Sequence, residues 1–197
     1  MRRLALVALV PLLLAACATS VKRLDVEEIK DVSGRWNDTD SQMVAKAMIQ
    51  DALSHPWVDQ FRRAHADRQP VLIVGTIRNR STEHIDTHTF VNDLQRAILN
   101  SGDATFVAAP GEREQLREER DAQAGFTEES TRSFHGKESG ADYMLLGSVN
   151  SIVDQEGRRA VVFYQVDLEL IDMRTNRKVW IGDKKIKKYV KRPAARL

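Results

Sequence analysis

The amino-acid sequence predicts a single α+β domain in which helices pack on a mixed β-sheet of about five strands. Apolar residues recur at helical spacing over the first two thirds of the chain, whereas the last third resembles a strand meander. In addition, residues 71–77 (VLIVGTI) and 143–149 (YMLLGSV) share the order of four apolar residues, a glycine, a small hydroxyl residue and a β-branched residue. Such near-continuous apolar runs are typical of strands buried on both faces, so we expect both at the middle of the sheet.

The helices are predicted from apolar spacing and from capping residues. Asp38 or Asp40 can cap the first helix, and Pro56 restarts the chain in a second, shorter helical segment. Gly102 follows the third helix, at the position where a left-handed cap is expected. Alternating charges after Pro110 predict a solvated helix face with ion pairs three and four residues apart. The predicted helices cover residues 38–55, the segment after 56, 86–101, 110–124 and 128–139.

The strands are predicted from short apolar runs that are bounded by turn residues. Gly75 and Gly147, inside the two central runs, predict a close approach of a neighbouring backbone or helix. In the last strand, Val179, Ile181 and Ile186 are expected to face the core. The predicted strands cover residues 70–77, 104–109, 142–153, 159–172 and 178–190.

The N-terminus has the pattern of a secretory signal. Arg2 and Arg3 precede an apolar stretch at residues 4–16, which is shorter than the ~20 residues of a spanning helix. Residues 14–17 (LAAC) resemble the lipobox of bacterial lipoproteins and contain the one cysteine of the chain, Cys17. The resemblance implies cleavage before Cys17 and acylation of that residue. The alternative is an ordinary signal peptide with an incidental cysteine. Ala18 is not the aspartate that favours inner-membrane retention, so we expect an anchor on the periplasmic face of the outer membrane.

These features predict a signal peptide at residues 1–16, a lipidated tether at residues 17–31 and a globular domain at residues 32–197. The chain has 30 Lys and Arg against 28 Asp and Glu, and removal of Arg2 and Arg3 with the signal balances the charges. The sequence therefore gives no indication of nucleic-acid binding. Acylation of Cys17 would also leave no thiol for a disulfide or a cysteine-based metal site.

Three groups of polar residues are candidates for contacts with a partner. Arg35 and Trp36 lie in a bend-forming stretch, SGRWNDTDS, where they form either an exposed recognition pair or a loop whose tryptophan packs on the domain. The second group, residues 78–80, directly follows a predicted central strand. The basic last strand is either a charged edge that resists aggregation, a docking surface for an acidic partner, or a contact with anionic lipid or glycan. The candidates in the second and third groups are Arg78, Asn79, Arg80, Lys184, Lys187 and Lys188.

No pattern in the sequence indicates catalysis. His84 and His88 have the spacing of two metal ligands on a helix, but they lie at or before a helix start, and Ile85 stands where HExxH has glutamate. Neither a phosphate-binding loop nor a nucleophile elbow is present. We therefore predict no enzyme, no metal, no cofactor other than the lipid, and no small-molecule substrate.

Several stretches together resemble one family. SGRWNDTDS, PVLIVGTIRNRS, DYMLLGSV and NRKVWIGDKKIKKYV look like the corresponding parts of the LpoB-type lipoproteins, over about residues 32–191. The resemblance implies a fold similar to the N-terminal domain of TolB and no catalytic activity. It also implies an outer-membrane lipoprotein that docks on a small domain of a class A penicillin-binding protein and stimulates this bifunctional peptidoglycan synthase.

The tether is shorter than the long linker of the best-known members of that family. Fully extended, residues 17–31 span about 50 Å, and as a relaxed coil about 20–25 Å. Two other functions fit a lipid-anchored domain. A subunit of an outer-membrane assembly or secretion complex would associate stably with itself, and a periplasmic enzyme acting on cell-wall material would turn over substrate alone.

Overall fold

The structure is a computed structural model that describes residues 21–131 and 137–192. Its described part contains four helices and five strands: two helices come first, strands and helices then alternate until residue 126, and three strands follow. The elements are α1 (Asp38–Ser54), α2 (Trp57–Ala64), β1 (Val71–Asn79), α3 (His88–Ser101), β2 (Thr105–Phe106), α4 (Pro110–Phe126), β3 (Tyr143–Glu156), β4 (Arg159–Asp172) and β5 (Lys178–Lys191).

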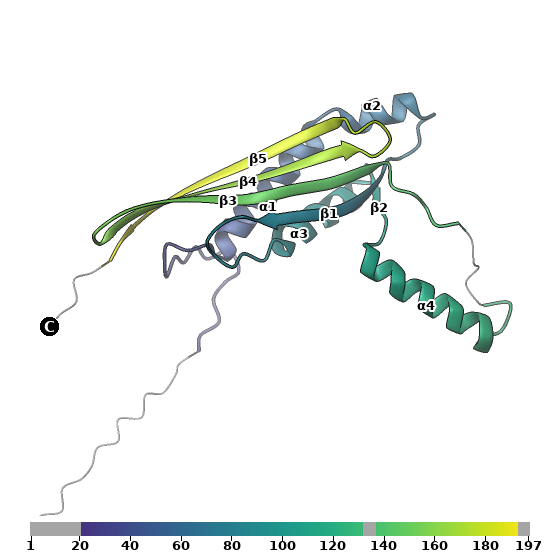
Figure 1. Ribbon diagram of the computed structural model, residues 1–197, viewed down its shortest axis with the longest axis horizontal. Helices are drawn as coiled ribbons and strands as arrows, with labels where there is room; N and C mark the ends of the chain where they lie inside the picture. The colour runs from purple at the N-terminus through teal and green to yellow at the C-terminus, as the bar shows by residue number, and fades with distance from the viewer. Residues whose placement is uncertain (1–20, 132–136, 193–197) are drawn as a thin grey trace, which may run out of the picture.

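The five strands form one mixed sheet in the order β2-β1-β3-β4-β5. β1 pairs in parallel with both β2 and β3, whereas β3, β4 and β5 are antiparallel neighbours (Figure 1). The two echoing apolar runs are therefore adjacent strands near the middle of the sheet, as predicted. The predicted α+β fold class is confirmed, and the likeness to TolB stays a prediction.

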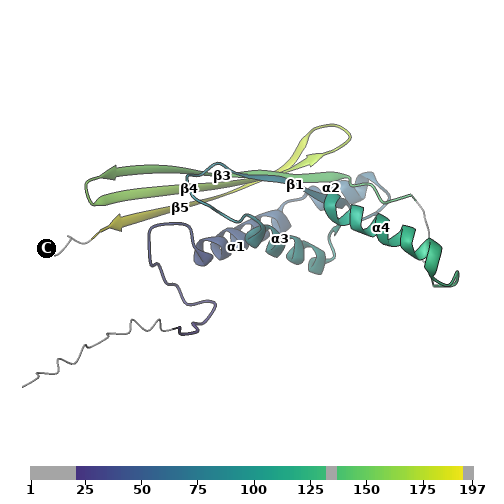
Figure 2. The same cartoon turned by 60° about the horizontal axis from the view of Figure 1, so that its bottom comes forward.

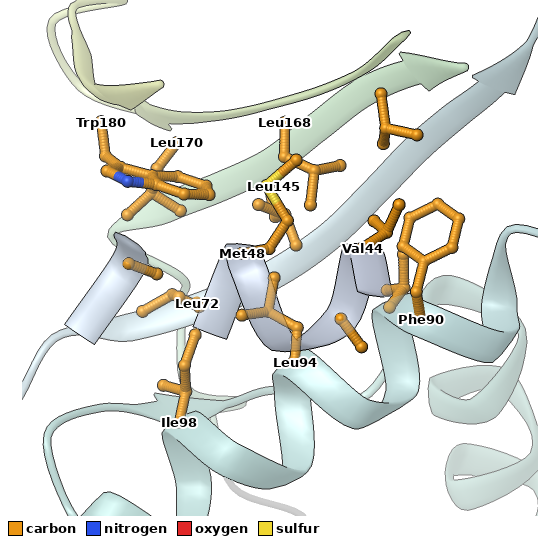
Figure 3. Close-up of a cluster of buried hydrophobic side chains, with 14 of the residues drawn as sticks. Val44, Met48, Leu72, Phe90, Leu94, Ile98, Leu145, Leu168, Leu170 and Trp180 are labelled. Carbon is orange, nitrogen blue, oxygen red and sulfur yellow. The ribbon is translucent and has the colours of Figure 1, made fainter. Parts of the chain in front are cut away.

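Helices α1 and α3 lie along one face of the sheet, which leaves the other face open (Figure 2). The apolar residues at helical spacing on α1 and α3 meet the inward side chains of the strands in a single core (Figure 3). Burying each large apolar side chain contributes about 1.5–3 kcal/mol. Core members with exposed fractions of 2% or less include Val44, Met48, Leu72, Phe90, Leu94, Leu145, Leu168 and Leu170.

The C-cap of α3 agrees with the prediction, whereas the N-cap of α1 is a different residue from the one predicted. The N-cap of α1 is Asn37, whose side chain accepts from the Asp40 amide, while the Asp40 carboxylate accepts from the Asn37 amide. The sequence analysis assigned the cap to Asp38 or Asp40, so Asp40 completes the cap but does not begin it. Gly102 closes α3 in the left-handed conformation, at φ 74°, as predicted.

Three local predictions are wrong. The strand expected at 104–109 is reduced to Thr105–Phe106. The helix expected at 128–139 is absent from the described residues 128–131 and 137–139. In β5, Trp180 and Ile186 face the core, and Ile181 is 58% exposed on the other face. Residues 180–186 pair with β4 without a register shift, so strict alternation places Ile181 on the face opposite Trp180 and Ile186.

Helix α4 stands apart from the rest of the domain (Figure 1). None of its residues is buried. Arg113, Arg117 and Arg120 all approach one carboxylate outside the helix, that of Glu138 on the returning chain. The helix is therefore held by exposed ion pairs, which contribute little stability individually.

Candidate docking surface

The face of the sheet opposite the helices is a broad surface of mixed polarity. Side chains alternate along a strand, so the residues between the core positions of β4 point away from the helices. The corresponding residue on β5, Ile181, is highly exposed, as are Ile152 on β3 and Tyr189 on β5, at 67% and 65%. Large exposed apolar side chains among charged ones are the composition expected of a protein-binding surface.

A shallow depression of about 410 Å³ lies on this open face. Arg78 and Arg80 border it on one side, and Asp167 and Glu169 on another. Leu146 on β3 lies between them, and Ile181 lies beyond Glu169 on the next strand. The depression thus offers opposite charges around an apolar centre, a combination that favours orientation as well as affinity.

The charged residues of the depression differ in whether they already have an ion-pair or hydrogen-bond partner. Asp167 accepts from the Gln165 amide at 2.7 Å, and Glu169 forms an ion pair with Lys178. No ion pair or side-chain hydrogen bond of Arg78 or Arg80 occurs within the described residues. The two arginines are therefore the charged groups of the depression that are best placed to meet a partner.

Gly147 forms part of the floor of the depression. A Cβ atom there would collide with the Asp167 carbonyl oxygen and with the Leu168 side chain of the neighbouring strand. This confirms the close approach of a backbone that the central glycine predicted. Substitution at Gly147 would push β3 and β4 apart and deform the open face.

Asn79 lies between the two arginines and is used within the fold. Its side-chain amide donates to the Glu83 carbonyl oxygen at 2.7 Å, and its side-chain oxygen accepts from the Ser81 amide at 3.0 Å. These bonds shape the turn after β1. Of the predicted group 78–80, the two arginines are available for contact and the asparagine holds the loop that presents them.

Trp36 packs on the domain, which settles the two alternatives for this residue. Its ring lies edge-on to Tyr164, with centroids 5.4 Å apart, and tilted against Phe90 at 6.4 Å. The indole N–H donates to the Ser41 hydroxyl at 2.9 Å. Arg35 remains exposed beside it. Of the two candidates, Trp36 is therefore packed on the domain and Arg35 faces solvent.

The sequence analysis missed Glu83, which joins three segments. Its carboxylate accepts from the Tyr164 hydroxyl at 2.7 Å and from the Trp36 amide at 2.8 Å. Burial and the bond to Glu83 raise the pKa of Tyr164 far above its ordinary value. A lone glutamate in a polar loop carries no sequence signal for this role, because both partners are distant in the chain.

Lys188 is a structural residue. Its ammonium lies 2.6 Å from Asp40 and 3.0 Å from Asp31, and it donates to the Arg35 carbonyl oxygen at 3.1 Å. Burial alone would lower the pKa of Lys188, but the hydrogen bonds that its ammonium donates to Asp40 and Asp31 raise it. A side chain that is 12% exposed and bonded in this way fastens the N-terminal segment to β5.

The other two predicted lysines lie on opposite faces of the edge strand. Lys184 is opposite Val166, on the helix-covered face, and is half-buried. Lys187 is opposite Phe163 on the open face and is exposed. The sheet order places β5 at an edge, in agreement with a charged edge strand. Lys187 alone among the three predicted lysines joins the open face.

The described residues show no group of three or more side chains that could hold a metal ion. Within the same residues, no helix combines the length and apolarity required to cross a bilayer. Cys17 lies outside the described residues.

Comparison with known proteins gives the family. The family model described as the peptidoglycan-synthase activator LpoB matches residues 40–186. The chain belongs to the LpoB family. This is a family of activators rather than of catalysts, and it indicates a synthase as partner. No curated protein gives a sequence match.

Several solved structures are similar to the chain. The C-terminal domain of LpoB from Escherichia coli is 19% identical, over 73% of this chain and 98% of that one, with a TM-score of 0.40. The corresponding domain from Salmonella enterica is 18% identical, over 73% and 97%, with a TM-score of 0.37. A PelC dodecamer from Paraburkholderia phytofirmans is 19% identical, over 61% and 74%, with a TM-score of 0.34.

Proposed function

We propose that this LpoB-family chain is a non-catalytic lipoprotein that stimulates a class A penicillin-binding protein by docking through the open face of its sheet. The activator family supports the function, and the position of Arg78 and Arg80 beside an apolar depression supports the choice of face. The observation that carries the proposal is this pair of arginines, because neither forms an ion pair within the described residues, and a docking domain with acidic residues would supply one.

Stimulation would be allosteric. A bound activator shifts an equilibrium only as far as it binds one conformation more tightly than another. The open face would therefore bind the active form of the synthase more tightly than the inactive form. Two kinds of contact would contribute: burial of Ile181 and its apolar neighbours supplies affinity, and the arginines supply orientation.

The anchor is a second part of the proposal. Acyl chains on Cys17 would hold the protein on the periplasmic face of the outer membrane, with about 0.8 kcal/mol for each buried methylene. The exposed segment at residues 21–31 would then act as the tether between lipid and domain. Mass spectrometry of the membrane-extracted protein tests this directly. A mature N-terminus without fatty acid, or one that does not begin at Cys17, would contradict it.

The activity test mixes residues 18–197 with a class A synthase from the same organism and measures the rate of glycan polymerisation. We expect a higher rate with the protein than without it. The Arg78→Glu and Ile181→Asp variants should lose most of this stimulation while they remain folded. The matched control is Arg63→Glu on α2, because Arg63 is an exposed arginine on the helix-covered side.

Two results would contradict the proposal. The absence of both stimulation and binding with the synthases of that organism would remove the function. Equal loss of stimulation in Arg63→Glu and Arg78→Glu would leave the activator function and remove the open face as its docking surface. Substrate turnover by the purified protein alone would show an enzyme instead.

A further inference from the structure

β1 has a free hydrogen-bonding edge along most of its length. On the side of β2, the Val107 amide donates to the Leu72 carbonyl oxygen at 2.9 Å, and the pairing of the two strands ends there. Alternate residues of a strand point their backbone groups to the same side, so Val74 is the next to face this edge. Within the described residues, no strand pairs with β1 on that side beyond Leu72.

A groove of about 390 Å³ runs beside this edge, between β1 and α3. Val74, Val91 and Val107 give it an apolar lining, and Pro110 at the start of α4 closes one end. Pro110 and Glu112, in the first turn of α4, line the groove, and none of the helix residues is buried. An exposed strand edge beside a groove that is closed by a helix is the arrangement by which proteins bind an extended peptide as an additional strand.

The two sides of an added strand would meet different surroundings. Thr76 on β1 borders both this groove and the depression with Arg78 and Arg80. Because successive side chains of a strand point to opposite faces, one set would enter the apolar groove. The other set would lie on the open face, near the two unpaired arginines. The edge therefore fits a segment that alternates apolar and acidic residues.

The chain itself contains such a segment. Residues 24–27 read Leu-Asp-Val-Glu, and they lie in the exposed N-terminal stretch. Val26 is 76% exposed and Ile29 is 74% exposed, although both are apolar. The one hydrogen bond of residues 21–30 to the domain, within the described part, is that from Gln42 to the Val26 carbonyl oxygen at 3.0 Å. An apolar segment and an apolar groove thus both lack a partner.

We infer that the tether of one copy, through residues 24–27, binds as an added strand to the β1 edge of a second copy. Leu24 and Val26 enter the groove against α3, and Asp25 and Glu27 meet Arg78 and Arg80. Extension opens one turn, in which the Glu28 amide donates to the Asp25 carbonyl oxygen at 3.1 Å. A single hydrogen bond contributes about 0.5–1.5 kcal/mol, which two or three bonds to β1 would offset. This association does not depend on activation of a synthase.

The interface is head-to-tail, because a donor segment meets a different acceptor surface. Such contacts close into rings or extend into open chains, depending on the rotation between copies. Attachment of each tether to a membrane would raise the local concentration of donor segments. The length of the tether would also determine how many copies can join.

The test uses the chain from residue 17 onward with Cys17→Ser, which removes the one native thiol. One preparation carries Asp25→Cys and a second, of different mass through a tag, carries Thr76→Cys. After mixing and mild oxidation, we expect a several-fold higher yield of the disulfide-linked heterodimer than in the control. The control replaces Thr76→Cys by Thr127→Cys, since both threonines are exposed and Thr127 lies at the far end of α4.

Sedimentation velocity provides a second readout. The average mass of the cysteine-free chain should rise with concentration, and Leu24→Asp with Val26→Asp should abolish the rise without altering the fold. Equal heterodimer yields at Thr76 and Thr127 would overturn the inference. A chain with both Asp25→Cys and Thr76→Cys that forms only an internal disulfide would also overturn it, because its own tether would then occupy the edge.

Discussion

The two faces of the sheet use the same strands in different ways. On the helix-covered face of β4, Tyr164, Val166 and Leu168 have no exposed surface. On the open face, the intervening Gln165 and Asp167 bond to each other beside a depression. The covered face is constrained by packing, whereas the open face can change without loss of the core. The difference shows where recognition can be located on this domain.

The largest expected effect comes from the core below the covered face. Leu94→Ala should lower the free energy of unfolding by about 2–5 kcal/mol, because Leu94 is fully buried and a cavity would remain. Ile181→Ala on the open face should change it by about 0.5 kcal/mol or less. Urea denaturation followed by circular dichroism measures both. Equal losses for the two variants would mean that the open face is packed against something in the protein.

Lys187 and Lys188 are neighbours on β5 and point to opposite faces of the sheet, so they allow the two faces to be compared within one strand. Lys188→Ala should cost about 3 kcal/mol, because it leaves the buried carboxylate of Asp40 without its cation. Lys187→Ala should be close to neutral. Thermal unfolding of the two variants side by side tests this. A stable Lys188→Ala variant would show that Asp40 is satisfied by Asn37 alone.

Alkaline pH should affect the covered face selectively. The folded-state pKa of Lys188 lies above its ordinary value near 10.5, and that of Tyr164 lies above its ordinary value near 10. Both shifts favour the folded state at pH values below the unfolded pKa, and this stability is lost as the pH rises through the folded pKa. The midpoint of thermal unfolding should therefore fall above about pH 10.

Two variants separate these groups. Lys188→Met and Tyr164→Phe should each reduce the fall of the unfolding midpoint between about pH 10 and 12. The phenylalanine variant loses the bond to Glu83 but keeps the ring that packs on Trp36. Arg78→Gln on the open face should leave the alkaline profile unchanged. An identical fall in all three variants would attribute the alkaline transition to other groups.

The sequence allowed most of the covered face to be predicted, and less of the open face. Helical spacing and the apolar strand runs are local patterns, so the boundaries of α1, α2 and α3 agree with prediction within a few residues. Ile181 was misassigned to the inward face of β5, although it lies five residues from Ile186 in a stretch that pairs with β4 without interruption, so alternation places the two on opposite faces. The register shift beside Leu170 affects only residues before Trp180 and depends on the partner strand. Such a shift has no mark in the sequence of β5 itself.

Among the candidate site residues, local relations could be predicted and long-range contacts could not. Arg78 and Arg80 were chosen because they follow the predicted strand at 70–77, a local relation, and the structure extends that strand to Asn79, so that it includes Arg78. Lys188 belongs to a network with Asp31 and Asp40, and these partners are more than 140 residues away in sequence. Charge runs predict that a strand is basic, but only the pleat of the sheet decides which of its lysines is buried.

The smallest expected effect comes from Asp31, the more exposed of the two carboxylates that bond to Lys188. Asp31 is half-exposed and 3.0 Å from Lys188, and Lys188 together with Asn37 lowers its pKa. An exposed pair contributes about 0–1 kcal/mol, so Asp31→Asn should shift the unfolding midpoint only slightly. Release of the N-terminal segment should nevertheless increase proteolytic cleavage between residues 21 and 36. Unchanged cleavage would show that Trp36 and the buried Asp40 hold this segment without Asp31.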